Sequence, residues 1–350
     1  MHWLATLSIA AVAVYAPSIS ARSLAADAAT AGWVTWSQRS GAVFEGHYTA
    51  SDPTLMQERD HLLMITTDLD PESKHTNLVA ATSPDGFSWQ FAATGAADIG
   101  LVLAGRDGQW DQNLETPELV RRGQTWLLYY CGYRDGGVPL NGFPAALGLA
   151  TSVDGRHFSR FANDPILRPT PGWYDNDAIY SPTIISDSAG GYIMLYVGHA
   201  YTQLDKIGGR GGVYLLAATS PDGIAWSKRP DPVISPGGTL AWMRDGAAEP
   251  ALVKAPDGIY YLFFTGLAGE DRTIGVGRSA SPFGPWQIDP VPIVVRTQDG
   301  FAAQKVLAPD VIIASGKARM WFLGSDDSER IRVGYAEAPW PIYTAPRAQP

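Results

Sequence analysis

The residues best suited to chemistry in this chain are carboxylates that stand just before a repeated proline. Asp52 and Glu249 each precede a proline directly, and Glu115 stands two residues before one. A few residues further upstream of these prolines lie Asp111, Asp175, Asp177 and Asp245. Two carboxyl groups in one site can serve as a general acid and a general base, or as a nucleophile, when their surroundings separate their pKa values. The pattern therefore predicts acid–base chemistry if the fold brings these positions together.

The elements that must position these acids are repeated along the chain. Each copy has a proline, a short β-branched run, a polar or glycine turn and an aromatic strand, and the prolines are Pro53, Pro117, Pro182, Pro250 and Pro309. A second repeat, close to Ala-Thr-Ser-Pro-Asp-Gly-x-x-Trp, occupies residues 81–89, 150–158 and 218–226, with a looser copy at 277–286. Asp-Gly between two apolar runs is a strong hairpin signal. Each unit therefore reads as four strands.

Four short strands that recur at a fixed period describe the blade of a propeller. We predict an all-β, five-bladed β-propeller with four antiparallel strands in each blade, formed as a single domain by residues 29–350. The fifth unit has no clear fourth strand, and Gly32-Trp33-Val34-Thr35-Trp36-Ser37 precedes the first blade without a blade of its own. We expect this N-terminal segment to complete blade five and close the ring. The Asp-Gly repeat is then a turn of the scaffold.

Composition narrows the classes of partner. The net charge of −9 argues against a nucleic-acid partner or an acidic membrane surface. Twelve Trp and fifteen Tyr among 350 residues suit an uncharged, ring-shaped ligand such as a sugar, although these residues also build ordinary cores. The lone Cys131 excludes an intramolecular disulfide and reads as a buried strand residue. We expect a monomer whose partner is a carbohydrate.

The first residues resemble an export signal. An apolar run follows Met1, is too short to span a membrane and is followed by small residues such as Ala26 and Ala28. We predict a signal peptide over residues 1–28 and a secreted or periplasmic protein.

In a propeller the innermost strands line a central channel, so the residues before each proline converge from the whole chain. We expect Asp52, Glu249, Glu115 and Asp177 to be catalytic. Residues expected to contact the substrate are Asp245, Arg244, Asp111, Trp110, Tyr180 and His199. Each has a structural alternative, such as an ion pair for Arg244 or packing between blades for Trp110. Carboxylates that converge in an aromatic-lined site are what cleavage of a glycosidic bond requires.

The motifs resemble a known group of enzymes. Ser51-Asp52-Pro53-Thr54 before an aliphatic strand, and the recurring strand pair around Asp-Gly-x-x-Trp, resemble the five-bladed glycoside hydrolases of families 43, 32, 68, 62, 117 and 130, the arabinanase, xylosidase, invertase and levansucrase relatives. The resemblance implies that Asp52 is the general base or nucleophile. For the general acid it implies Glu249 by its place in the fourth unit, or Glu115 by its spacing from the proline.

One part of the family pattern is missing. Ser181 stands where family 43 has a third carboxylate before the proline of the third unit, so Asp177 or Asp245 would tune the acid instead. The resemblance calls for no cofactor and no catalytic metal, and leaves room for a structural calcium ion in the channel.

We therefore expect a glycoside hydrolase that acts on an arabinofuranoside or xyloside type of oligosaccharide or polysaccharide, by inversion with Asp52 as base. Two alternatives stay open. One is a phosphorylase like those of family 130, which needs a phosphate site built from Arg, Lys or His. The other is a sugar-binding propeller without catalysis.

Overall fold

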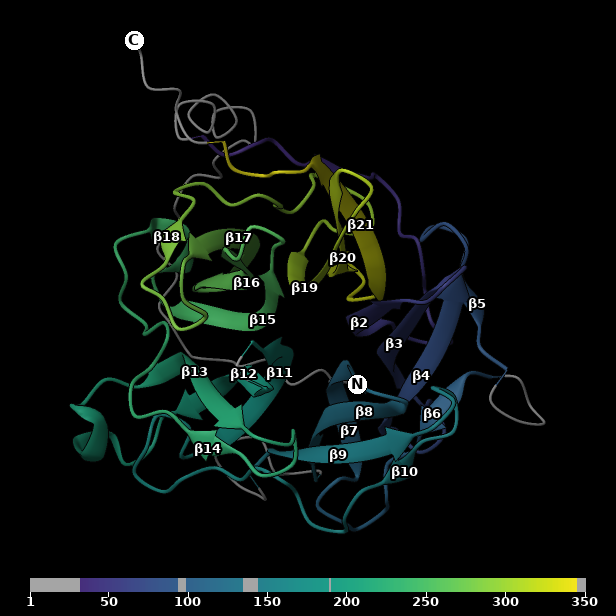
Figure 1. Cartoon of the computed structure of the whole chain (residues 1–350), viewed down its shortest axis with the longest axis horizontal. Helices are drawn as coiled ribbons and strands as arrows, with labels where there is room; N and C mark the ends of the chain where they lie inside the picture. Colours follow the sequence, from purple (N-terminus) through teal and green to yellow (C-terminus); the bar gives the residue numbers. More distant parts are fainter. Residues whose placement is uncertain (1–31, 94–98, 135–143, 189, 345–350) are drawn as a thin grey trace.

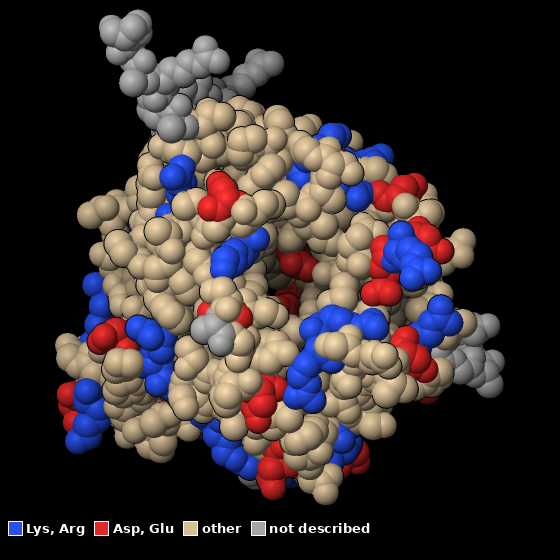
Figure 2. Space-filling model, in the orientation of Figure 1, with Lys and Arg blue, Asp and Glu red and all other residues tan. Residues whose placement is uncertain are grey.

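The fold is a ring of five antiparallel sheets, as predicted from the repeats (Figure 1), and the centre of the ring is hollowed into a channel (Figure 2). The structure is a computed structural model, and it describes residues 32–93, 99–134, 144–188 and 190–344. In each sheet one strand faces the channel and the others follow outward. The innermost strands contact one another in the order β2, β7, β11, β15, β19 and back to β2. The channel is thus walled by segments from the whole chain.

The five blades have the following strands. Blade one comprises β2 (Ser51–Gln57), β3 (Leu62–Leu69), β4 (Thr76–Ser83) and β5 (Gln90–Phe91), and β6 (Leu101–Leu103) also pairs with β4. Blade two comprises β7 (Asn113–Arg122), β8 (Thr125–Tyr133), β9 (Ala146–Ser152) and β10 (Ser159–Arg160). Blade three comprises β11 (Ala178–Asp187), β12 (Gly191–Ala200), β13 (Gly212–Ser220) and β14 (Ser227–Lys228). Blade four comprises β15 (Gly246–Lys254), β16 (Tyr260–Ala268), β17 (Asp271–Ser279) and β18 (Gln287–Ile288). Blade five comprises β19 (Lys305–Ala314), β20 (Lys317–Ser325), β21 (Ile331–Pro339) and β1 (Ser37–Gln38).

Two short 3₁₀ helices lie in the loops, η1 (Leu204–Ile207) and η2 (Ala241–Met243). Across the described ranges, none of the helices has the length and apolar character needed to cross a membrane. The predicted signal peptide, residues 1–28, lies outside the described residues.

The N-terminal strand closes the ring, which confirms the predicted closure. β1 pairs with β21 through Ser37 opposite Glu337 and Gln38 opposite Ala336. The segment before β1 follows the other chain end, with an isolated bridge between Trp33 and Tyr343. The paired residues fall at the end of the predicted segment and one residue beyond it. Both ends of the described chain are therefore held in blade five.

The Asp-Gly repeat builds turns between the third and fourth strands, as predicted. In blade one the Asp85 carboxylate accepts the backbone N–H groups of Phe87 and Ser88, both at 2.8 Å. Gly86 has a φ of 85°, which the turn requires and which favours glycine. Trp321 of blade five donates its indole N–H to the Gly86 carbonyl at 2.9 Å. The turn therefore also joins neighbouring blades.

Each innermost strand is interrupted by a bulge at its proline. Pairing with the second strand shifts register between Ser51 and Thr54 in blade one, and at the same place in the other four blades. The residues before the five prolines all have left-handed backbone, with φ between 45° and 52°: Asp52, Thr116, Ser181, Glu249 and Ala308. A non-glycine residue in this region costs about 1–3 kcal/mol and persists only where its surroundings enforce it. The bulge is a repeated device that re-aims one side chain per blade.

Candidate active site

The five proline bulges meet at the channel. The residues on both sides of the prolines line one cavity there, among them Asp52, Glu118, Glu249 and Asp310. Figure 2 shows acidic side chains at the bottom of a hollow in the centre of the ring, with basic groups on its rim. The innermost strands thus collect carboxylates from blades one, two, four and five. The repeat predicted them from blades one to four, and no carboxylate of blade three lines this cavity among the described residues.

Asp52, Glu115 and Glu249 form a group of interacting carboxyls, here named the carboxyl trio. Burial raises the pKa of Asp52 to about 8, and the charges of Glu115 and Glu249 contribute to the rise, while hydrogen bonds from Ser51 and Thr67 oppose it. Glu115 of blade two and Glu249 of blade four are therefore each close enough to Asp52 of blade one for their charges to act on it. Three of the four predicted catalytic residues come together.

The two glutamates of the trio have different supports. The phenol of Tyr133 donates a hydrogen bond to Glu115 Oε1 at 2.5 Å. Burial raises the pKa of Glu115, and this hydrogen bond opposes the rise because it favours the ionised form. Burial also raises the pKa of Glu249, opposed by a hydrogen bond from Thr265 and by the charge of Arg272. Glu249 Oε2 is buried and has no hydrogen-bond partner among the described residues.

The bulge explains why Glu115 and Glu249 both reach Asp52 although their spacings from the proline differ. On a regular strand, a shift of one residue would turn the side chain to the opposite face. Here the left-handed residue before the proline interrupts the alternation, and Glu249 lines the channel cavity from that position. Spacing alone therefore does not decide between the two glutamates, because a bulge is not visible in the spacing.

A second ring of residues, directly after the prolines, was not predicted as a group. In four of the five blades the side chain at this place accepts a backbone N–H from the next blade around the ring. Thr54 accepts from Leu119 at 3.2 Å, Glu118 from Ile184 at 2.6 Å, Thr183 from Leu252 at 3.1 Å and Asp310 from Leu55 at 2.5 Å. Blade four has Ala251 at this place, which has no side-chain acceptor. The signal was present in the sequence, as a polar residue after the proline in four of five copies.

Glu118 and Asp310 of this second ring are acids whose main contacts are structural. Burial raises the pKa of Glu118 well above its ordinary value, and the charge of Asp310 adds to the rise. Burial raises the pKa of Asp310 to about 6, opposed by the N–H groups of Leu55 and Val311. Their oxygens join adjacent blades, so we assign them to the scaffold of the channel.

Asp177 holds a loop. Its carboxylate accepts the N–H groups of Tyr201 and Thr202 at 2.5 and 2.9 Å, the Thr202 hydroxyl and the Asn176 side-chain amide. These contacts occupy both oxygens and are typical of a carboxylate that fixes a loop. The catalytic role predicted for Asp177 stays a prediction.

Tyr180, His199 and Tyr201 form an aromatic wall on blade three. The ring centroids of Tyr180 and His199 are 5.0 Å apart, and those of His199 and Tyr201 are 6.0 Å apart. Burial lowers the pKa of His199 to about 4, so the ring is neutral at neutral pH. His199 Nδ1 is buried and has no hydrogen-bond partner among the described residues. An unsatisfied polar atom in such a wall suits a ligand hydroxyl.

Asp245 and Arg244 lie together at the beginning of β15. Their side chains are both about half exposed, with 3.6 Å between Arg244 Nε and Asp245 Oδ2. Asp245 also accepts the N–H of Gly269 at 2.7 Å. The predicted substrate contacts of these two residues stay predictions, and the ion pair is present.

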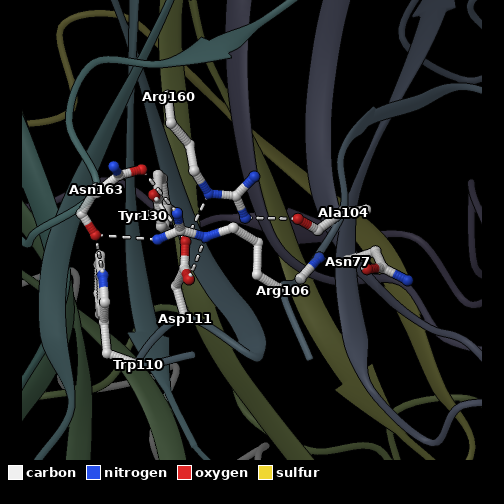
Figure 3. Close-up of polar contacts among 9 residues, drawn as sticks. Asn77, Ala104, Arg106, Trp110, Asp111, Tyr130, Arg160 and Asn163 are labelled. Carbon is white, nitrogen blue, oxygen red and sulfur yellow. Dashed lines mark hydrogen bonds and ion pairs between the residues drawn. The ribbon is translucent and has the colours of Figure 1, made fainter. Parts of the chain in front are cut away.

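Asp111 and Trp110 belong to a network of ion pairs and ring contacts (Figure 3), and the substrate contacts predicted for them stay predictions. Asp111 is fully buried and pairs with Arg106 Nε at 2.8 Å and Arg160 Nε at 2.6 Å. Trp110 stacks on Tyr130 with an interplanar angle of 11°, and its indole donates to the Asn163 carbonyl at 2.7 Å. The sequence could not separate Asp111 and Trp110 from the channel acid Glu115, because all three stand a few residues before the same proline, Pro117.

Among the residues that the structure describes, no group of three or more His, Cys, Asp or Glu side chains is arranged to hold a metal ion.

Comparisons with known proteins show that the fold is shared with solved structures. No protein-family model matches this chain, and no curated protein matches its sequence. Solved structures match it over most of its length, and several are described as glycoside hydrolases.

Three of these solved structures show the extent of the likeness. A complex of BT0996 with RGII has a TM-score of 0.69 at 16% identity, and the match covers 94% of this protein and 98% of the other. A thermostable family-43 glycoside hydrolase has a TM-score of 0.64 at 15% identity and covers 87% of this protein and 97% of its own length. The β-1,2-mannobiose phosphorylase from Listeria innocua has a TM-score of 0.64 at 13% identity and covers 85% and 90%. At these identities the likeness shows the shared five-bladed fold.

Proposed function

We propose that the protein is a glycoside hydrolase whose reaction takes place at the carboxyl trio. The observation that carries the proposal is the meeting of Asp52, Glu115 and Glu249, whose pKa values are all raised by burial, that of Asp52 also by the charges of the two glutamates. Carboxyls in this state supply both a proton donor and a proton acceptor near neutral pH. Their position in the channel of a fold shared with glycoside hydrolases supports a sugar substrate.

The three carboxyls share their protons, and together they provide the proton donor and the proton acceptor. With the pKa of Asp52 near 8, the three carboxyls hold at least one proton at neutral pH, and this proton belongs to the group as a whole. When it lies on a glutamic acid, Asp52 is ionised. The glutamic acid then protonates the glycosidic oxygen as the bond to the anomeric carbon breaks, and Asp52 takes a proton from the attacking water.

Replacement of each carboxyl by its amide separates the roles. An acid variant, Glu249→Gln or Glu115→Gln, should lose most activity on aryl glycosides with poor leaving groups and keep it on dinitrophenyl glycosides, which need no proton. Asp52→Asn should lose activity on both, and azide should restore it. Equal losses for all three variants on all leaving groups would contradict this division of roles.

The substrate is to be found by a screen of aryl arabinofuranosides, xylosides and plant or bacterial polysaccharides. The anomer formed first, read by NMR, decides between inversion, which we propose, and retention. A phosphorylase would need added phosphate for turnover. Among the described residues, one basic side chain, Arg272, has a charge that acts on a member of the trio, Glu249. A phosphate ion is ordinarily held by several basic groups. Hydrolysis is therefore the proposal that the site favours.

We further propose that the protein works as an exported monomer. The apolar N-terminal run and its small-residue cleavage sites support export. N-terminal sequencing of the protein secreted from an expressing cell should begin near residue 29, and retention of residues 1–28 would contradict the proposal.

A further inference from the structure

Arg272 is the residue near the trio that the proposed reaction leaves unexplained. It lies on β17 opposite Leu267 of β16, and Leu267 in turn lies opposite Gly246 at the beginning of β15. This register places Arg272 at the end of blade four where the chain enters the innermost strand that carries Glu249. Its charge acts on Glu249 and on Tyr201 of the neighbouring blade.

The guanidinium is anchored through one nitrogen only. Nη1 donates to the Gly269 carbonyl at 2.7 Å and to the Asp271 carbonyl at 2.9 Å. These two bonds use both hydrogens of Nη1 and fix the plane of the group. Gly269 is itself held by Asp245 through a hydrogen bond of 2.7 Å. The arginine is therefore positioned by its own hairpin.

The opposite edge of the guanidinium is free. Nε and Nη2 of Arg272 have no hydrogen-bond partner or ion pair in the described part of the chain, and the residue is partly exposed. Other arginines near the same end of the blades are paired, with Arg244 beside Asp245, Arg296 beside Asp271 and Arg332 beside Asp326. The Nε and Nη2 hydrogens point the same way and form the fork that matches the two oxygens of a carboxylate.

Two further unsatisfied atoms lie on blades three and four. Glu249 Oε2 and His199 Nδ1 are buried without partners among the described residues, and Tyr201 links this wall to Arg272. We propose that the sugar bound beside Glu249 carries a carboxylate, and that the free edge of Arg272 binds it. The substrate class is thus a glycoside that contains a uronic acid, which differs from the neutral sugar suggested by composition. The inference rests on the proposed glycosidase function.

The test compares one acidic polysaccharide with its own neutral form. Uronic-acid-containing polysaccharides, such as pectin and glucuronoxylan fractions, are assayed before and after chemical reduction of their carboxyl groups to alcohols. The wild type should cleave the acidic form at least tenfold more efficiently. Removing Arg272 also removes a charge that acts on Glu249, so Arg272→Gln is read as a ratio: kcat/KM on the acidic form should fall by about 10- to 100-fold more than on the reduced form, as expected for a lost hydrogen-bonded charge pair.

Arg296→Gln is the matched control. It removes the same charge from the same corner of blade four, but from a side chain already paired with Asp271 at 3.1 Å. It should keep the preference for the acidic form. Equal cleavage of both forms by the wild type, or an equal loss on both forms in Arg272→Gln, would overturn the inference. A requirement for inorganic phosphate that Arg272→Gln removes would assign the free edge to phosphate and would overturn it as well.

Failure of the proposed function is read separately. If no polysaccharide is cleaved, the glycosidase proposal fails, and binding of the same acidic and reduced oligosaccharides is measured by calorimetry. Tighter binding of the acidic form that is lost in Arg272→Gln and kept in Arg296→Gln would still support the carboxylate site. Equal binding of both forms would overturn it.

Discussion

At the scale of single residues, the proposed reaction depends on carboxyls that the fold keeps in an unfavourable setting. The pKa of Asp52, raised to about 8, means that folding holds a proton within the trio that the unfolded chain would release at neutral pH. A carboxyl whose pKa is higher in the folded than in the unfolded state lowers the free energy of unfolding as pH rises from its unfolded pKa to its folded pKa. Asp310, with a pKa raised to about 6, acts in the same direction.

The first prediction concerns stability and pH. For the wild type we expect the free energy of unfolding to fall between about pH 4 and 8. Asp52→Asn removes the charge that forms at the top of this range, so the variant should be more stable than the wild type at pH 9, on the order of 1 kcal/mol. Urea unfolding at pH 5 and pH 9 measures both. A variant that is less stable than the wild type at pH 9 would show that the Asp52 carboxylate stabilises the fold.

The second prediction concerns Tyr133, which the sequence did not single out. Its phenol donates to Glu115 and favours the ionised carboxylate. Tyr133→Phe should raise the pKa of Glu115 and move one limb of the pH–rate profile upward by about one unit. The profile is measured as kcat/KM on the substrate from the screen.

Tyr130→Phe is the control for Tyr133. Tyr130 also donates to a carboxylate, Asp111, at 3.3 Å, but in the structural network outside the trio. It should leave the pH–rate profile in place. A profile that does not move in Tyr133→Phe, or moves equally in both variants, would contradict the role given to Tyr133.

At the scale of elements, the unit of organisation is the innermost strand with its proline bulge. The residue before the proline lines the channel cavity, and in four of the five blades the residue after it accepts a hydrogen bond from the next blade. One short segment therefore carries both chemistry and assembly. The left-handed backbone at Asp52 and Glu249 is energetically unfavourable by itself. The ring of hydrogen bonds between blades helps to hold it in place.

The third prediction concerns that ring. Thr183 is buried and accepts the Leu252 N–H at 3.1 Å. Thr183→Val keeps the shape and removes the acceptor, which leaves a buried N–H unsatisfied and should cost about 1–3 kcal/mol. Chemical denaturation measures the loss. Thr219→Val, at a partly exposed strand position, should cost less than about 0.5 kcal/mol, and equal effects of the two changes would contradict the ring.

The strands and turns could be predicted from the sequence because their signals are local. Asp-Gly sets a hairpin turn, and an aromatic run after a short turn sets the second strand. The bulge could not be predicted, since the residue before a proline ordinarily avoids helical backbone and a left-handed Asp or Glu has no composition signal. Glu115 and Glu249 therefore stayed undecided, and Asp111 was grouped with channel residues that it does not join.

At the scale of the whole molecule, the closed ring brings the trio together from blades one, two and four. Closure depends on β1, which joins the beginning of the described chain to blade five. The closing segment also buries Trp33 and Trp36, which are 6% and 9% exposed, in the core of blades four and five. The site is therefore a property of the complete ring.

The fourth prediction concerns this closure. Deletion of residues 29–40 should abolish cooperative folding, because it removes a strand and two buried indoles. Trp36→Ala alone should cost about 3–5 kcal/mol, and Thr35→Ala, its exposed neighbour, should cost little. Calorimetry measures each transition. An unchanged melting temperature after the deletion would show that the ring closes without this segment.

The central claim is that the trio is a catalytic site, and turnover by Asp52→Asn tests it most directly. On the glycoside identified by the screen, with folding of the variant confirmed by calorimetry, we expect kcat to fall by about 10³-fold or more. A folded Asp52→Asn variant that cleaves the glycoside at the wild-type rate would contradict the claim.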